Sequence, residues 1–123
     1  MIFKIKGRDR LLLVTDSLAL AGTDATHGFM QSTEYVIEDG VCKLMDRSAF
    51  AGSIATADRL VRVMVQEAGV SVPDAVYMIT ETPAAVMGLT DKGKLAAGYD
   101  ADLVVFDDDI CIQHVFVHGQ AVL

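Results

Sequence analysis

The chain has 123 residues, enough for one domain with a modest core but well short of the ~250 residues of a complete eight-stranded α/β barrel. Its 17 acidic and 10 basic residues give a net charge of −7, which disfavours nucleic acid and anionic membranes as partners. Because 52% of the residues are apolar, we expect part of the apolar surface to be covered by another chain, as in a homo-oligomer, or by further sequence.

Nothing in the sequence indicates a membrane or secretory destination. No stretch approaches the ~18 uninterrupted apolar residues of a membrane span, and residues 1–6 lack the apolar core of a signal peptide. We therefore predict a cytoplasmic protein. Cys42 and Cys111 lie far apart in strand-like patterns, which favours reduced thiols packed as apolar side chains over the alternative of a disulfide.

The first predicted element is a strand that ends in a carboxylate. Residues 10–16 contain the run Leu11-Leu12-Leu13-Val14 without polar alternation, which predicts one buried strand. This strand delivers Asp16 into a loop of small residues, and barrel enzymes present an acid or a base in this way. Small and polar residues then continue, so residues 17–33 are predicted to form a loop with room for function.

A hairpin and three helices are predicted next. Residues 34–45 alternate around Asp39-Gly40, a dipeptide that favours a tight hairpin turn. The apolar contacts of the hairpin would come from Tyr35, Ile37, Val41 and Leu44. After a break at residues 50–53, a helix capped by Ser53 or Thr56 should run to about Ala68.

Capping and helix-breaking residues mark where the next two helices begin. Ser71 and Asp74 have the spacing of a capping box, and Pro73 falls in the tolerated first turn. Pro83 predicts a break after Thr82, followed by a short helix over residues 84–87.

The last part of the chain has the character of a sheet. Residues 101–107 and 110–117 are β-branched runs that predict strands, separated by the acidic turn Asp107-Asp108-Asp109. A turn at His118-Gly119 leads to a final extended segment, residues 120–123. The acidic turn lacks the alternating oxygen ligands of a calcium-binding loop, so we interpret it as structural.

The three histidines allow two interpretations each. His114 and His118 are four residues apart on a predicted strand and would face the same way, as a metal-binding pair requires. Zinc needs three or four ligands and no third candidate is nearby, so a solvated strand face is favoured. His27 could reach a substrate from the loop after Asp16, although loop histidines are more often merely exposed.

Four segments carry a resemblance to a known family. They are Lys6 to Gly22 with the Val-Thr-Asp strand end, Phe50-Ala-Gly-Ser53, Thr82-Pro-Ala-Ala-Val-Met-Gly88, and Lys92-Gly-Lys-Leu-Ala-Ala-Gly-Tyr-Asp-Ala-Asp-Leu-Val-Val-Phe-Asp107. Together they resemble the carboxyl-terminal part of N-acetylglucosamine-6-phosphate deacetylases, members of the amidohydrolase superfamily. Many amidohydrolases share the last segment, whereas the combination of the strand, the hairpin and the Ala-Gly-Ser loop points to the deacetylases.

The resemblance implies a fold. The chain would be an α/β fragment from the carboxyl-terminal end of an amidohydrolase-type TIM barrel, continued by strands of a small β-sandwich. The parts are expected as follows: the last barrel strand and catalytic loop in residues 1–33, a β-hairpin in 34–48, the barrel-closing helices in 49–90 and the β-sandwich strands in 91–123.

The resemblance also implies an activity and its residues. Asp16 would be the general base and acid, and Phe50, Ala51, Gly52 and Ser53 would contact the sugar. A carboxylate beside a metal-bound water can accept a proton and later donate it to the departing amine. The reaction would be metal-dependent hydrolysis of N-acetylglucosamine 6-phosphate to glucosamine 6-phosphate and acetate, with zinc or iron in the complete enzyme.

The metal ligands of the family have no counterpart among these residues. They are a glutamate and histidines on earlier barrel strands, so we expect no metal site in the chain and no activity from it alone. Two alternatives stay open. Another amidohydrolase, dihydroorotase-like or adenine-deaminase-like, shares the final motif, and a non-catalytic domain would only fold and associate.

Overall fold

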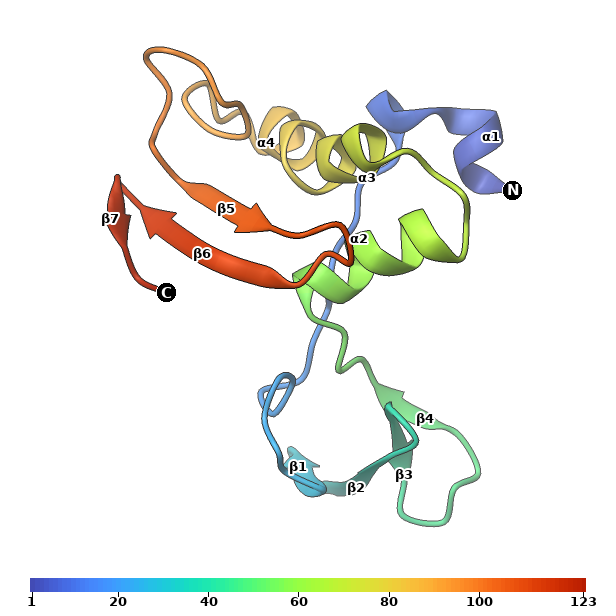
Figure 1. Cartoon of the computed structure of the whole chain (residues 1–123). Helices are drawn as coiled ribbons and strands as arrows, with labels where there is room; N and C mark the ends of the chain where they lie inside the picture. Colours follow the sequence, from blue (N-terminus) through green and yellow to red (C-terminus); the bar gives the residue numbers. More distant parts are fainter. The chain divides into compact units, whose positions relative to one another are not determined.

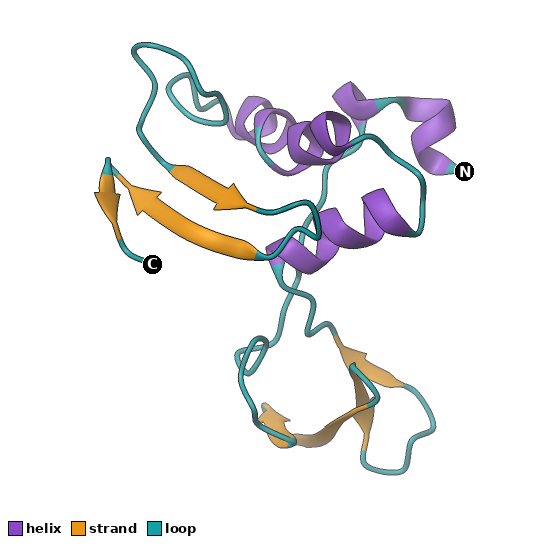
Figure 2. Cartoon of the chain, in the orientation of Figure 1, coloured by secondary structure: helices purple, strands orange, loops and turns teal.

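A computed structural model describes all residues from 1 to 123 and has a mixed α/β character (Figures 1 and 2). The chain forms two compact units. Residues 15–57 form what we call the sheet unit, and residues 1–14 with 58–123 form the helix–sheet unit. None of the helices combines the length and apolar character needed to cross a membrane.

The sheet unit is a four-stranded antiparallel sheet in the order β1-β2-β3-β4. Its strands are β1 (His27–Met30), β2 (Thr33–Glu38), β3 (Val41–Leu44) and β4 (Phe50–Gly52). The predicted hairpin is confirmed: Glu38 pairs with Val41, and the two residues between them have φ angles of 54° and 72°. Those angles are typical of the type I′ turn, whose twist matches that of the flanking strands.

The core of the sheet unit differs from the predicted set. Tyr35, Val36 and Cys42 are buried, whereas Ile37, like Val41 and Leu44, is only half-buried. Burial of two successive residues means that both faces of β2 are covered, which a simple alternation of inside and outside does not anticipate.

Strands β1 and β4 lie in segments predicted to be a loop and a break. In β1, Gly28 pairs with Tyr35, and a Cβ at position 28 would stand 2.5 Å from Tyr35 Cζ and 2.6 Å from Leu20 Cδ1. The glycine thus makes room for the tyrosine ring across the strand pair. The prediction was wrong here because glycine and small residues weaken the strand pattern, while the pairing depends on contacts with β2 and β3.

In the helix–sheet unit, two short helices at the amino terminus precede three longer ones. The short helices are α1 (Ile2–Lys6), which the sequence does not predict, and the 3-10 helix η1 (Arg8–Arg10). The helices are α2 (Ala57–Gln66), α3 (Val72–Ile79) and α4 (Glu81–Met87). The core of the unit is a cluster of five buried side chains: Val61, Val70, Ala75, Met78 and Ile110.

Local chemistry explains where α3 and α4 begin. The predicted cap of α3 is confirmed, because Ser71 Oγ accepts the Asp74 N–H at 3.3 Å and donates to Asp74 Oδ2 at 2.8 Å. The predicted start of α4 is wrong: Pro83 lies inside its first turn, where no N–H is needed, and the chain breaks earlier, at Thr80.

The carboxyl-terminal strands form a three-stranded antiparallel sheet in the order β5-β6-β7. They are β5 (Leu103–Phe106), β6 (Ile112–Val117) and β7 (Gln120–Ala121), so the predicted strands are present and slightly shorter. The acidic turn between β5 and β6 is held by Asp107, whose Oδ1 accepts the N–H groups of Asp109 and Cys111.

The predicted buried strand over residues 10–16 is not formed. Residues 11–16 belong to no helix or strand, and the Leu13 N–H donates to the Met78 carbonyl at 2.9 Å. Leu11 and Leu13 pack against the core cluster instead. A barrel strand is paired on both sides, and no other strand of this chain pairs with residues 11–14. The apolar run therefore fills the helical core, and the assignment to a barrel stays a prediction.

Candidate active site

Asp16 lies in the sheet unit, with an exposed side chain. Its φ of 46° places the backbone in the left-handed region, which aspartate tolerates better than most residues. The carboxylate is thus presented from a segment outside any helix or strand rather than from the end of a regular strand.

A short parallel contact joins the segment after Asp16 to the end of β4. Ser17 and Ser53 form an isolated parallel bridge, and the Leu18 N–H donates to the Ser53 carbonyl at 2.8 Å. The Ser17 hydroxyl also donates to the carbonyl of Ala55. This contact brings together the two predicted parts of the site, Asp16 and residues 50–53, which are distant in the sequence.

Residues 50–53 offer different groups to a ligand. Phe50 is 75% exposed, so its ring is accessible on the surface of the sheet unit. Ala51 is half-buried. Gly52 is exposed, and it makes room for Leu18, because a Cβ there would lie 2.9 Å from Leu18 Cδ1. Ser53 accepts the Ala55 N–H on its hydroxyl at 3.1 Å, which leaves the hydroxyl proton able to donate.

The histidines do not join this site. His27 begins β1, at the opposite edge of the sheet from β4, and its Nδ1 lies 2.9 Å from Thr26 Oγ1. The expectation that His114 and His118 share a strand face is wrong, because β6 ends at Val117 and His118 lies in the following turn with a φ of 49°.

No group of three or more His, Cys, Asp or Glu side chains lies close enough together to hold a metal ion. The donor set of this chain therefore does not fit the divalent metal that the resemblance implies. Both cysteines are free, Cys42 buried in the sheet unit and Cys111 exposed in the helix–sheet unit.

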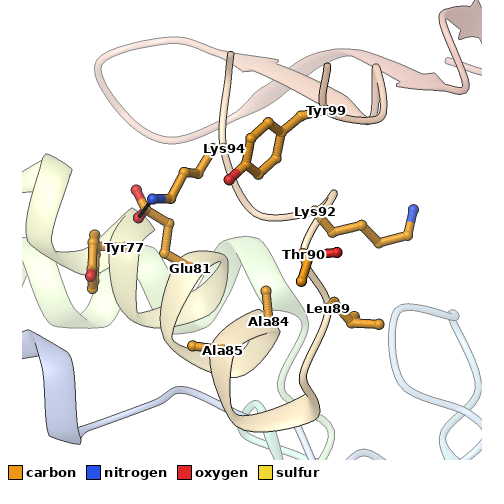
Figure 3. A pocket seen from close by; sticks show the side chains of 9 residues that line it. All are labelled: Tyr77, Glu81, Ala84, Ala85, Leu89, Thr90, Lys92, Lys94 and Tyr99. Atoms are coloured by element: carbon orange, nitrogen blue, oxygen red, sulfur yellow. Dashed lines mark ion pairs between the residues drawn. The ribbon is translucent and has the colours of Figure 1, made fainter. Parts of the chain in front are cut away.

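A second group of polar side chains was not singled out from the sequence. A hollow of about 300 Å³ in the helix–sheet unit is lined by residues from α3, α4 and the loop that follows α4 (Figure 3). Its lining residues are Tyr77, Glu81, Ala84, Ala85, Leu89, Thr90, Lys92, Lys94 and Tyr99. The two lysines and Tyr99 belong to the last of the four family-like segments, so a polar pattern was visible but had no predicted role.

Comparisons with known proteins cover almost the whole chain. The model of the amidohydrolase family matches residues 9–122. The chain is 31% identical over 121 residues to N-acetylglucosamine-6-phosphate deacetylase of Lysinibacillus sphaericus, with 98% of this chain and 31% of that protein covered. It is also 31% identical over 118 residues to N-acetylgalactosamine-6-phosphate deacetylase of a Shewanella strain, with 96% and 30% covered.

Solved structures agree with these sequence matches. A mutant N-acetyl-D-glucosamine-6-phosphate deacetylase from Mycobacterium smegmatis, in complex with N-acetyl-D-glucosamine-6-phosphate, matches with a TM-score of 0.87 and 32% identity, over 99% of this chain and 33% of that one. The enzyme from Pasteurella multocida matches with a TM-score of 0.90 and 28% identity, over 97% and 31%. The chain thus spans about a third of the length of these relatives.

Proposed function

Because the chain belongs to the amidohydrolase family, we propose that it supplies the catalytic carboxylate and a sugar-contacting segment to an N-acetylglucosamine-6-phosphate deacetylase. The reaction is hydrolysis of the acetamide of N-acetylglucosamine 6-phosphate, which gives glucosamine 6-phosphate and acetate. One observation carries the proposal: the bridge between Ser17 and Ser53 holds Asp16 beside residues 50–53.

Asp16 is proposed to transfer protons in both halves of the reaction. Its carboxylate accepts a proton as water attacks the acetamide carbonyl, and the resulting carboxylic acid donates that proton to the leaving amine. Residues 50–53 would receive the sugar, with the accessible ring of Phe50, the exposed backbone of Gly52 and the hydroxyl of Ser53 as contacts.

We propose that this chain does not supply the metal ligands of the complete enzyme. Deacetylases of this family are generally metal-dependent, and we expect zinc or iron there. Since the donor set of the chain does not fit a metal, we propose that residues outside these 123 provide the ligands and that the chain alone is inactive. Elemental analysis of the purified chain tests this part: about one tightly bound metal ion per chain would contradict it.

We propose that, in the complete enzyme, the leucine run over residues 11–14 is the last strand of a TIM barrel, and that the enzyme is a cytoplasmic homo-oligomer. Self-association is tested by sedimentation of the chain at tens of micromolar, a concentration at which weak self-association is detected. A clean monomer would contradict it for the chain.

A second candidate substrate is N-acetylgalactosamine 6-phosphate. The Shewanella relative is named for that sugar and is as similar to the chain, at 31% identity, as the Lysinibacillus relative named for the glucosamine sugar. The two substrates differ only in the configuration at one carbon of the ring. The relatives reported above are all deacetylases of this kind, so dihydroorotase-like and adenine-deaminase-like activities are not favoured.

The test is a chimera in which this chain replaces the matching third of the Mycobacterium smegmatis enzyme. We expect the chimera to deacetylate one or both sugar phosphates, and the ratio of the two kcat/KM values assigns the substrate. Asp16→Asn should lower kcat at least ~10²-fold while the metal content is retained. Glu34→Gln, which alters an exposed glutamate of the sheet unit outside the predicted catalytic loop, is the matched control and should leave kcat unchanged. Near-normal turnover of Asp16→Asn would remove Asp16 from the catalytic role.

A further inference from the structure

The hollow over α4 shares no residue with the candidate active site, because all its lining residues belong to the helix–sheet unit. The loop after α4 forms one wall, and Gly93 lets that loop approach the helix closely. A Cβ at position 93 would lie 2.9 Å from the Thr80 carbonyl oxygen and 3.1 Å from Ala84 Cβ, and its φ of 87° also favours glycine. The close approach of this loop to the helix thus forms one side of the hollow.

The charged groups around the hollow neutralise one another. Lys94 Nζ lies 3.2 Å from Glu81 Oε2, an ion pair that joins the loop to α4 (Figure 3). Lys92 Nζ lies 2.6 Å from Asp100 Oδ2 and 2.7 Å from Asp102 Oδ2. The Glu81 contact raises the pKa of Lys94, so this ammonium stays charged at neutral pH. A charged ligand would therefore find no uncompensated partner here.

The paired groups still have capacity for hydrogen bonds. An ammonium has three donors and a carboxylate about four acceptor positions, so a single contact between Lys94 and Glu81 leaves both able to bind hydroxyl groups. The hydroxyls of Tyr99 and Thr90, which line the same hollow, can each donate and accept. Such mixed donors and acceptors suit a ligand that carries several hydroxyls.

The other side of the hollow is apolar. Ala84, Ala85 and Leu89 line it, and Figure 3 shows the ring of Tyr99 extending from its loop toward the ion pair. Tyr77 contributes less, since the Arg8 guanidinium stacks on its ring at 4.4 Å from the centroid. An aromatic face with methyl groups beside hydrogen-bonding groups is suited to the two chemically different sides of a sugar ring: the C–H face and the hydroxyl rim.

We propose that this hollow is a binding site for one neutral monosaccharide ring. Its volume of about 300 Å³ lies at the lower end of the ~300–1,000 Å³ typical of small-molecule pockets, which suits a single ring and not an oligosaccharide. The Tyr99 ring stacks on the sugar, and Lys94, Glu81 and Thr90 bind its hydroxyls. All lining residues except Ala84 are half-buried or exposed, so we expect weak binding, with a Kd on the order of 1 mM.

The test is an NMR titration of the whole 123-residue chain with methyl β-D-glucopyranoside. We expect chemical-shift changes at residues 77–99 that saturate in the millimolar range, and saturation transfer between the Tyr99 ring and the sugar protons. Glucose 6-phosphate, which adds an anion to the same ring, should bind this hollow more weakly. Asp16→Asn should change nothing, so the outcome does not depend on the proposed deacetylase activity.

Two variants sharpen the test. Glu81→Gln leaves Lys94 without its counter-charge, so we expect the preference to invert toward glucose 6-phosphate, while the control Glu67→Gln, at an exposed glutamate elsewhere, keeps the wild-type preference. Tyr99→Leu should weaken binding of the neutral sugar at least tenfold. Absence of saturable shifts, shifts confined to residues 15–57, or an unchanged preference in Glu81→Gln would overturn the proposal. If Tyr99→Leu fails to fold, absence of saturation transfer from Tyr99 in the wild-type chain overturns it.

Discussion

Substitutions at Asp16 test whether this position serves chemistry at some cost to the fold. The φ of 46° costs an ordinary L-residue about 1–2 kcal/mol, and aspartate somewhat less. Glycine avoids this cost but loses ~0.5–1 kcal/mol through its greater freedom in the unfolded chain. We therefore expect Asp16→Gly to raise the free energy of unfolding by up to about 1 kcal/mol, although it removes the proposed catalytic group.

Two further substitutions bracket that value. Asp16→Asn keeps the shape of an exposed side chain and should change the free energy of unfolding by less than ~0.5 kcal/mol. Asp16→Val places a β-branched residue at a positive φ and should lower it by about 1–3 kcal/mol. The expected order of stability is thus glycine, then aspartate with asparagine, then valine.

Urea unfolding followed by circular dichroism gives the global values for this series. Hydrogen exchange of peptides from residues 15–57 reports on the sheet unit, a compact unit that contains position 16. Asp24→Asn is the control for loss of one negative charge in the same unit. If Asp16→Asn lowered the free energy of unfolding by more than 1 kcal/mol, the carboxylate would be holding the structure, and the reasoning above would be refuted.

Three other outcomes are expected of the isolated chain. Met78→Ala, at a fully buried core position, should lower the free energy of unfolding by about 2–5 kcal/mol. Urea unfolding measures this loss, and a value below ~1 kcal/mol would show that Met78 is not part of the core. Cys111 should react quickly with a thiol reagent and Cys42 only on unfolding, because Cys42 is 1% exposed and burial raises its pKa; equal rates would refute this. The hydrogen bond from Lys92 lowers the pKa of Asp102 below its ordinary 3.8, so this stabilisation is present above that pH and is lost as the pH falls through the lower folded value. Unfolding curves between pH 6 and pH 2 should show that loss, and Lys92→Met should reduce it; an identical pH dependence in the variant would contradict the assignment.

Local chemistry decided which elements could be predicted from the sequence. The turn at Asp39-Gly40 and the cap at Ser71 depend on neighbouring residues alone, and both are present where expected. The run over residues 11–14 is different, because an apolar segment does not specify what will cover it. Here it meets α3 and the core cluster instead of strands on both sides.

The sequence predicted which residues make up the candidate site but not the contact that joins them. Asp16 and residues 50–53 came from the resemblance, but the bridge between Ser17 and Ser53 is a contact between distant segments that no local pattern reveals. The same limit applies to the ion pair between Lys94 and Glu81, which joins a helix to a loop. The turn at His118-Gly119 is present where the sequence predicted it, so His118, which was also counted as part of the preceding strand, lies outside β6.

The interruption of the helix–sheet unit by the sheet unit constrains the order in which the chain can fold. The Thr82 hydroxyl donates to the Arg8 carbonyl at 2.9 Å, and the Leu13 N–H donates to Met78, so the unit is completed only when its two separate segments meet. Closing the intervening loop costs entropy that grows with its length, and the hairpin contacts of residues 15–57 are local and fast to form. We therefore expect the sheet unit to collapse first and shorten the effective loop, so that a slower hairpin turn would delay association of the amino terminus with α3.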